Sequence, residues 1–171
     1  PGQSVSAFAV GKNVVQAEMG LLYEQQDHNL LKPFIVKSSS FKYLSNCLKA
    51  HLERFPDSKT GLNVLETNIL NLVKNNEIKS KHHLLGYAMN YQGYYGYGDL
   101  QLVRIIDRLS LFFNIKDESI ELNRNGHEAL LGQHNFSKEI ENDMVFGGVK
   151  KLDFQFSKSE NKLIKSPFNV N

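Results

Sequence analysis

The chain has little cysteine, no tryptophan and no long apolar run. Its single cysteine, Cys47, excludes a disulfide within the 171 residues and fits a reducing compartment. No apolar run approaches the roughly eighteen residues that a membrane span needs, and no secretory signal pattern opens the sequence. We therefore expect a cytoplasmic location and no membrane partner.

The charge is nearly balanced, because 20 Lys and Arg stand against 18 Asp and Glu and give a net charge of +2. Dedicated nucleic-acid binders are usually much more basic, so composition alone does not favour phosphate binding. The apolar content of 41% is enough for one core. The sequence begins at Pro1 without methionine, so we expect it to be either a processed product or a piece excised from a longer protein.

Apolar residues recur at helical spacing in five segments, with turn or capping signals between them. Asn63 and Glu66 form the pattern of a capping box, and Asp99 is expected to cap the last helix. Nine of the fourteen residues in that last helix are apolar, which predicts a largely enclosed element. The predicted helices are 13–31, 38–55, 63–75, 80–90 and 100–113.

The pattern changes to alternation after Asn114, which predicts short strands. Asn125-Gly126 supplies a turn signal, and a short helix is expected through Ala129 to Leu131. The predicted strands are 119–123, 145–149, 151–156 and 163–164. These elements predict a mainly helical α+β fold, divided into an N-terminal helical pair (1–56), a core (57–135) and a C-terminal β-hairpin extension (136–171) that form one globular unit.

Three helices followed by a strand are the order of a winged-helix or helix-turn-helix module. The core at 57–135 is therefore expected to be winged-helix-like, with segment 100–113 as its recognition helix. The exposed strip of that helix and its surroundings offer side chains that suit phosphates and base edges. The candidate nucleic-acid-binding residues are Gln101, Arg104, Arg108, Lys79 and Lys81.

Segment 86–99 holds five of the seven tyrosines and four of the twelve glycines. Tyrosine joins an apolar ring to a polar tip, so this loop suits stacking on bases or on a protein partner. An equally available interpretation is a turn whose tyrosines cover the core. The candidate surface residues are Tyr91, Tyr94, Tyr95 and Tyr97.

Catalytic and metal-binding motifs are weak. Cys47 and His51 are one helical turn apart, but Cys47 falls on the apolar stripe, where a buried thiol is usual. His127-Glu128 and His134 do not form a zinc-binding His-Glu-x-x-His motif. We expect no catalytic residue, metal site or cofactor, although an enzyme that uses Cys47 or His127 stays a third option.

Three motifs stand out in the second half of the chain and in the segment before it. They are His51-Leu52-Glu53-Arg54-Phe55-Pro56 with Thr60-Gly61-Leu62, Glu66 and Leu70; Ile120-Glu121-Leu122-Asn123-x-x-Gly126-x-x-Ala129-Leu130-x-Gly132; and Phe146-Gly147-Gly148-Val149. Over roughly 33–164 they resemble the C-terminal region of bacterial proteins that carry "domain of unknown function 1835". The closing strand of that family is usually rich in tryptophan, whereas this chain has Phe154 and Phe156. The resemblance implies that the N-terminal domain of the family is absent from this chain or changed beyond recognition, and it implies no settled activity.

The sequence therefore leaves two main functions open. The first is a non-enzymatic regulatory module that binds nucleic acid in transcription. The second is a protein-interaction or dimerisation domain of a larger protein, which would self-associate or bind a protein partner.

Overall fold

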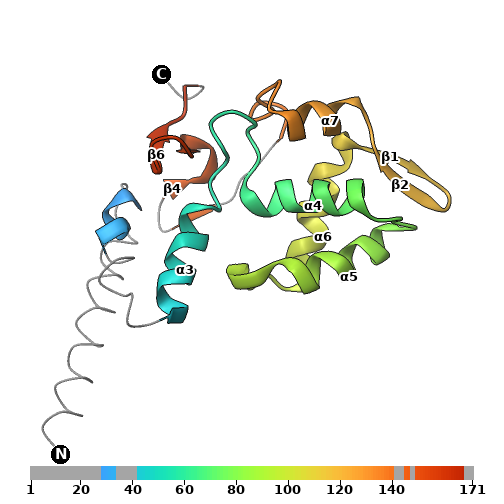
Figure 1. Ribbon diagram of the computed structural model, residues 1–171, viewed down its shortest axis with the longest axis horizontal. Coiled ribbons are helices and arrows are strands. Elements are labelled where there is room, and N and C mark those ends of the chain that lie inside the picture. The colour runs from blue at the N-terminus through green and yellow to red at the C-terminus, as the bar shows by residue number, and fades with distance from the viewer. Residues whose placement is uncertain (1–27, 34–41, 141–144, 147–148, 168–171) are drawn as a thin grey trace, which may run out of the picture.

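The computed structural model has an α+β fold, and the residues that it describes form five α-helices and small antiparallel strand pairs (Figure 1). It describes residues 28–33, 42–140, 145–146 and 149–167. Most of the predicted helix 13–31 lies outside this part, and its last residues, His28–Leu31, form a 3₁₀ turn. The α-helices are α3 (Lys42–Leu52), α4 (Val64–Asn75), α5 (Lys81–Tyr91), α6 (Asp99–Arg108) and α7 (Arg124–Leu131).

Helix α3 turns one stripe of side chains inward, and this stripe differs slightly from the predicted one. Leu48, His51, Leu52 and Phe55 are buried. Cys47 is exposed, so the prediction of a buried thiol was wrong. Cys47 directly precedes Leu48, and a helix turns about 100° per residue, which carries it off the buried stripe.

Helix α4 begins with the predicted capping box. The Glu66 N–H donates to Asn63 Oδ1 at 2.8 Å, and the Asn63 N–H donates to Glu66 Oε2 at 2.8 Å. The two bonds satisfy two backbone donors that a helix start leaves open. At the next helix, Ser80 caps α5 by accepting from the His83 N–H at 3.1 Å.

Helix α6 begins one residue earlier than predicted. Gly98 and not Asp99 occupies the N-cap position, and the Gln101 side chain accepts from the Gly98 N–H at 3.0 Å. The helix ends at Arg108 and tightens into a 3₁₀ turn, Leu109–Phe112. Phe113 belongs to a strand that the sequence did not predict.

That strand, β1 (Phe113–Lys116), pairs with β2 (Ser119–Leu122) in an antiparallel hairpin. Ile78, which lies between α4 and α5, joins the hairpin through an isolated antiparallel bridge, and the Ile120 N–H donates to its carbonyl at 2.7 Å. Along the chain, the elements of the core are therefore α4, the Ile78 bridge, α5, α6 and the β1–β2 hairpin.

The predicted turn at Asn125-Gly126 is wrong, because both residues lie in α7, which Asn123 caps. Gly126 is needed there for space, since a Cβ on it would lie 2.7 Å from the Phe112 carbonyl oxygen. The chain thus has glycine at position 126 because α7 packs closely there, and not because a hairpin turns at this residue.

The described part of the C-terminal region contains two short antiparallel strand pairs, where the sequence predicted a small antiparallel sheet or hairpin. Strand β3 (Val145–Phe146) pairs with β4 (Val149–Lys150), and β5 (Phe154–Ser157) pairs with β6 (Lys162–Lys165). The predicted strand 151–156 begins only at Phe154, because Lys151–Asp153 form a 3₁₀ turn that places the Lys151 ammonium 2.6 Å from Glu66.

Among the described residues, two apolar clusters build the core. The larger one joins α4, α5, α6, α7 and the β1–β2 hairpin, with Leu65, Ile69, Leu84, Leu102 and Phe112 among its most buried members. The smaller one joins the end of α3 to the C-terminal hairpins through Leu52, Phe55, Phe146, Val149 and Leu163. Figure 1 shows the same division, with β4 and β6 on the α3 side of the molecule.

Candidate functional site

Apolar side chains on the outward face of α6 are exposed, although the sequence predicted a largely enclosed helix. Leu102, Ile105 and Ile106 point into the core, whereas Leu100 is 73% exposed and Val103 is 38% exposed. The helix is therefore not largely enclosed, and the apolar count misled because it ignored which face each residue occupies. We call Asp99, Leu100, Val103 and Arg104 the α6 patch.

The sequence did not single out Leu100 and Val103 as functional residues. A count of apolar residues over 100–113 indicates burial without saying which face each residue occupies. Spacing alone does not separate the two exposed residues from the buried ones, because Val103 is three residues from Leu100 and also three residues from the buried Ile106.

The predicted nucleic-acid-binding residues are only partly available to a ligand. Lys81 is ion-paired with Asp107 at 2.6 Å. The carboxamide oxygen of Gln101 is engaged in starting α6, and Arg108 is half-buried. Lys79 and Arg104 are exposed, and neither makes an ion pair with the described residues. The exposed strip of α6 and its surroundings therefore offer fewer available cationic side chains than the sequence predicts.

The four candidate tyrosines separate into two pairs. Tyr91 and Tyr94 are exposed at 64% and 46%, whereas Tyr95 and Tyr97 are 7% exposed each. Tyr95 and Tyr97 are therefore buried, and only Tyr91 and Tyr94 are exposed to a ligand or partner. The loop within segment 86–99 is also shorter than predicted, because residues up to Tyr91 belong to α5.

Side chains at the end of α3 hold the buried tyrosine pair. The Arg54 guanidinium donates to the Tyr95 carbonyl at 2.9 Å and lies 5.3 Å from the centre of the Tyr97 ring. The Tyr95 hydroxyl lies 3.4 Å from Glu53, and burial together with this carboxylate raises the pKa of the Tyr95 phenol well above its usual range. The loop after α5 is thus fastened to the α3 end, which supports its interpretation as a turn that covers the core.

His51, which the sequence suggested as a partner of Cys47, is buried next to His28. His51 Nε2 lies 3.0 Å from His28 Nδ1, and both rings pack against Phe55. Burial is the main cause that lowers the pKa of His51 to about 4, and the charges of His28 and Arg54 add to it. Because Cys47 is exposed and His51 is buried against His28, the structure does not bring thiol and imidazole into one pocket.

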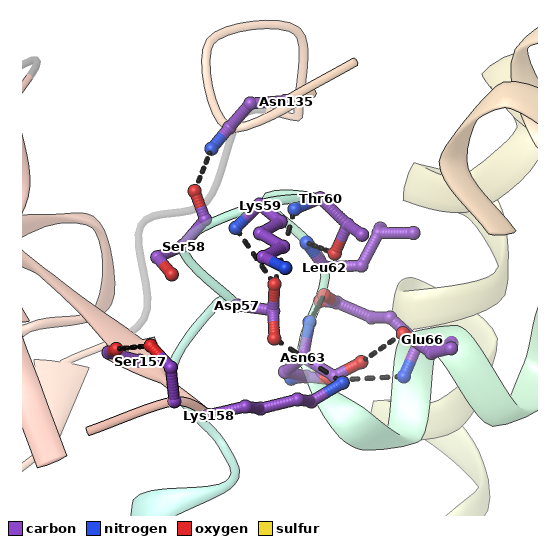
Figure 2. A network of polar contacts seen from close by, with 12 residues as sticks. Asp57, Ser58, Lys59, Thr60, Leu62, Asn63, Glu66, Asn135, Ser157 and Lys158 are labelled. Atoms are coloured by element: carbon purple, nitrogen blue, oxygen red, sulfur yellow. Dashed lines mark hydrogen bonds and ion pairs between the residues drawn. The ribbon is translucent and has the colours of Figure 1, made fainter. Parts of the chain in front are cut away.

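Asp57 centres a polar network that joins three parts of the chain (Figure 2). Its carboxylate accepts from the Lys59 N–H at 2.8 Å and lies 3.3 Å from the Lys158 ammonium. Asn135 donates to the Ser58 carbonyl at 2.8 Å, which brings the segment after α7 to the same loop. These contacts satisfy polar groups of the loop and connect segments, which is a structural role.

Among the residues that the structure describes, no group of three or more His, Cys, Asp or Glu side chains is arranged to hold a metal ion. None of the helices in the described part is both long and apolar enough to cross a membrane. His127, the other candidate for an enzyme, is an exposed residue of α7.

Comparison of the chain with protein-family models, curated protein sequences and solved structures gives no match.

Proposed function

We propose that this chain is a non-enzymatic interaction module with a winged-helix-like core, and that it self-associates through the α6 patch. The order of α4, the Ile78 bridge, α5, α6 and the β1–β2 hairpin supports the winged-helix interpretation. The observation that carries the interaction function is the exposure of Leu100 and Val103 side by side on α6.

The α6 patch is complementary to itself. Two α6 helices that pack antiparallel about a two-fold axis between positions 101 and 102 place each Leu100 against the partner's Val103. The same operation places the two Asp99 side chains along one side of this apolar centre and the two Arg104 side chains along the other. An apolar centre with a polar rim is the arrangement that protein interfaces favour.

The patch is small, so the expected dimer is weak. Stable dimers bury about 1,200–2,000 Å² of total surface, which four side chains from each copy do not reach. We expect a dissociation constant of about 10–100 µM, which corresponds to a binding free energy of roughly −5.5 to −7 kcal/mol.

Sedimentation velocity over a concentration series tests this function. The sedimentation coefficient of the chain should rise with concentration, and Leu100→Glu should hold it at the monomer value. Leu131→Glu is the matched control, because Leu131 is 69% exposed but lies on α7. A monomer at every concentration up to about 1 mM, or equal effects of the two variants, would count against the proposal.

Binding of nucleic acid is the second candidate, and Arg104 is the observation that favours it. This side chain is exposed on the helix that a winged-helix module inserts into the major groove. Balanced charge and the Lys81–Asp107 pair weaken this candidate. Affinity for mixed duplex DNA should fall steeply with salt and should weaken in Arg104→Ala; absence of binding at low salt would eliminate it.

A further inference from the structure

A groove of about 300 Å³ lies between α4 and the end of α5. Figure 1 shows these two helices side by side. The residues that line the groove share a neutral polar character, apart from one leucine. They are Asn68, Asn71, Leu72, Asn75, Asn76 and Tyr91.

Three of the asparagines have open hydrogen-bonding groups. Asn68, Asn71 and Asn75 follow one face of α4, about 4.5 and 6 Å apart along the helix axis. Within the described residues, none of these three carboxamides makes a hydrogen bond, whereas Asn76 donates to the Leu72 carbonyl at 2.9 Å. Each open carboxamide presents a donor and an acceptor in one plane.

Tyr91 gives the groove an aromatic face. The side chain is 64% exposed, and its ring lies nearly parallel to the Tyr87 ring, with 14° between the planes and 6.4 Å between the centres. The parallel neighbour supports the ring from within α5. An exposed ring of this kind is a surface on which a flat ligand can stack.

The absence of charge from the described lining limits the ligand class. A phosphate or carboxylate would need a cation, and none of the lining residues carries one. A sugar would gain most from a charged acceptor for its hydroxyls, and none is present there either. The lining instead suits a flat neutral ligand whose edge alternates donors and acceptors.

We propose that this groove binds a purine base of the adenine type, as a base or a nucleoside. The face of the purine stacks on Tyr91. Its edge pairs with the carboxamide of Asn71 or Asn75, because an asparagine matches the donor and acceptor at adenine N6 and N7. The site is independent of the α6 patch and does not rest on self-association.

A titration of the chain with adenosine, followed by ¹⁵N–¹H NMR, tests the inference. Amide signals around Asn71 and Tyr91 should shift and saturate in the low-millimolar range or below. Tyr91→Ala should weaken binding about tenfold, and Asn71→Ala should do so to a similar extent. The matched controls are Tyr43→Ala, whose tyrosine is 71% exposed on α3, and Asn114→Ala on β1, and neither should change the affinity.

Two results would overturn the inference. If 10 mM adenosine shifts no groove signal in the folded chain, the groove is not a purine site. If uridine or methyl glucoside produces the same shifts with the same affinity, the ligand class is wrong. Thermal melting of each variant shows whether a lost response reflects lost folding.

Discussion

At the scale of single residues, the buried histidines make stability depend on pH. The pKa of His51 is lowered from 6.5 to about 4. Between these two pH values the unfolded chain therefore binds a proton at His51, whereas the folded chain does not. Stability is therefore complete above about pH 6.5 and is lost as the pH falls toward 4, by up to about 3 kcal/mol. Arg54 and His28 are the charged or titratable groups that disfavour the proton.

Urea unfolding at a series of pH values measures this effect. Between pH 7 and pH 4.5 the free energy of unfolding should fall, and the double variant His28→Leu with His51→Leu should lose most of that slope. His82→Gln is the control, because His82 is exposed on α5 and makes no hydrogen bond or ion pair with the described residues. An unchanged slope in the double variant would assign the pH effect to other groups.

Gly61 is a second residue whose identity the local geometry requires. Its φ is +75°, and a Cβ on it would lie 2.3 Å from the Ser137 nitrogen. Gly61→Ala should therefore destabilise the chain by more than about 2 kcal/mol. Gly96→Ala has the same backbone penalty, with φ of +65° but open space around the Cβ, and should cost only about 1 kcal/mol. Equal losses in thermal melting would show that the contact with Ser137 is unimportant.

At the scale of elements, a buried ion pair fixes the C-terminal hairpins to α4. Lys151 Nζ lies 2.6 Å from Glu66 Oε1, and the two side chains are 3% and 5% exposed. Lys151→Met removes one charge and leaves the other buried, so it should cost about 3 kcal/mol. The double variant with Glu66→Gln should recover part of this loss.

The exposed pair of Lys116 and Glu121, 3.1 Å apart, provides the control. Lys116→Met should change the free energy of unfolding by no more than about 0.5 kcal/mol. Equal effects of Lys116→Met and Lys151→Met in denaturant unfolding would contradict a special role for the buried pair.

Local signals predicted the elements well, and distant contacts explain where they failed. The Asn63–Glu66 capping box could be predicted because its two members are three residues apart. The burial of Tyr95 could not, because its partners Arg54 and Glu53 are 41 and 42 residues away in the chain. The exposure of Leu100 also depends on packing, since a sequence does not state which α6 face meets α5.

At the scale of the whole molecule, polar contacts join regions that are far apart in the sequence. The Asp57 network connects the loop before α4 to Lys158 in the C-terminal region and to Asn135 after α7 (Figure 2). These contacts do not cover α6, where Leu100 and Val103 of the α6 patch are exposed. The division into three segments and the resemblance to domain of unknown function 1835 stay predictions.

Self-association through α6 is the central claim, and a pair of charged variants tests its geometry directly. Leu100→Glu and Val103→Lys should each weaken the dimer about tenfold or more in sedimentation equilibrium, because each places a charge in the apolar centre. An equimolar mixture of the two variants should associate more tightly than either variant alone, because one Glu then faces one Lys across the two-fold axis while the other Leu100–Val103 contact is kept. Thermal melting must confirm that each variant folds. A mixture as weak as the single variants, or single variants that dimerise normally, would contradict the account.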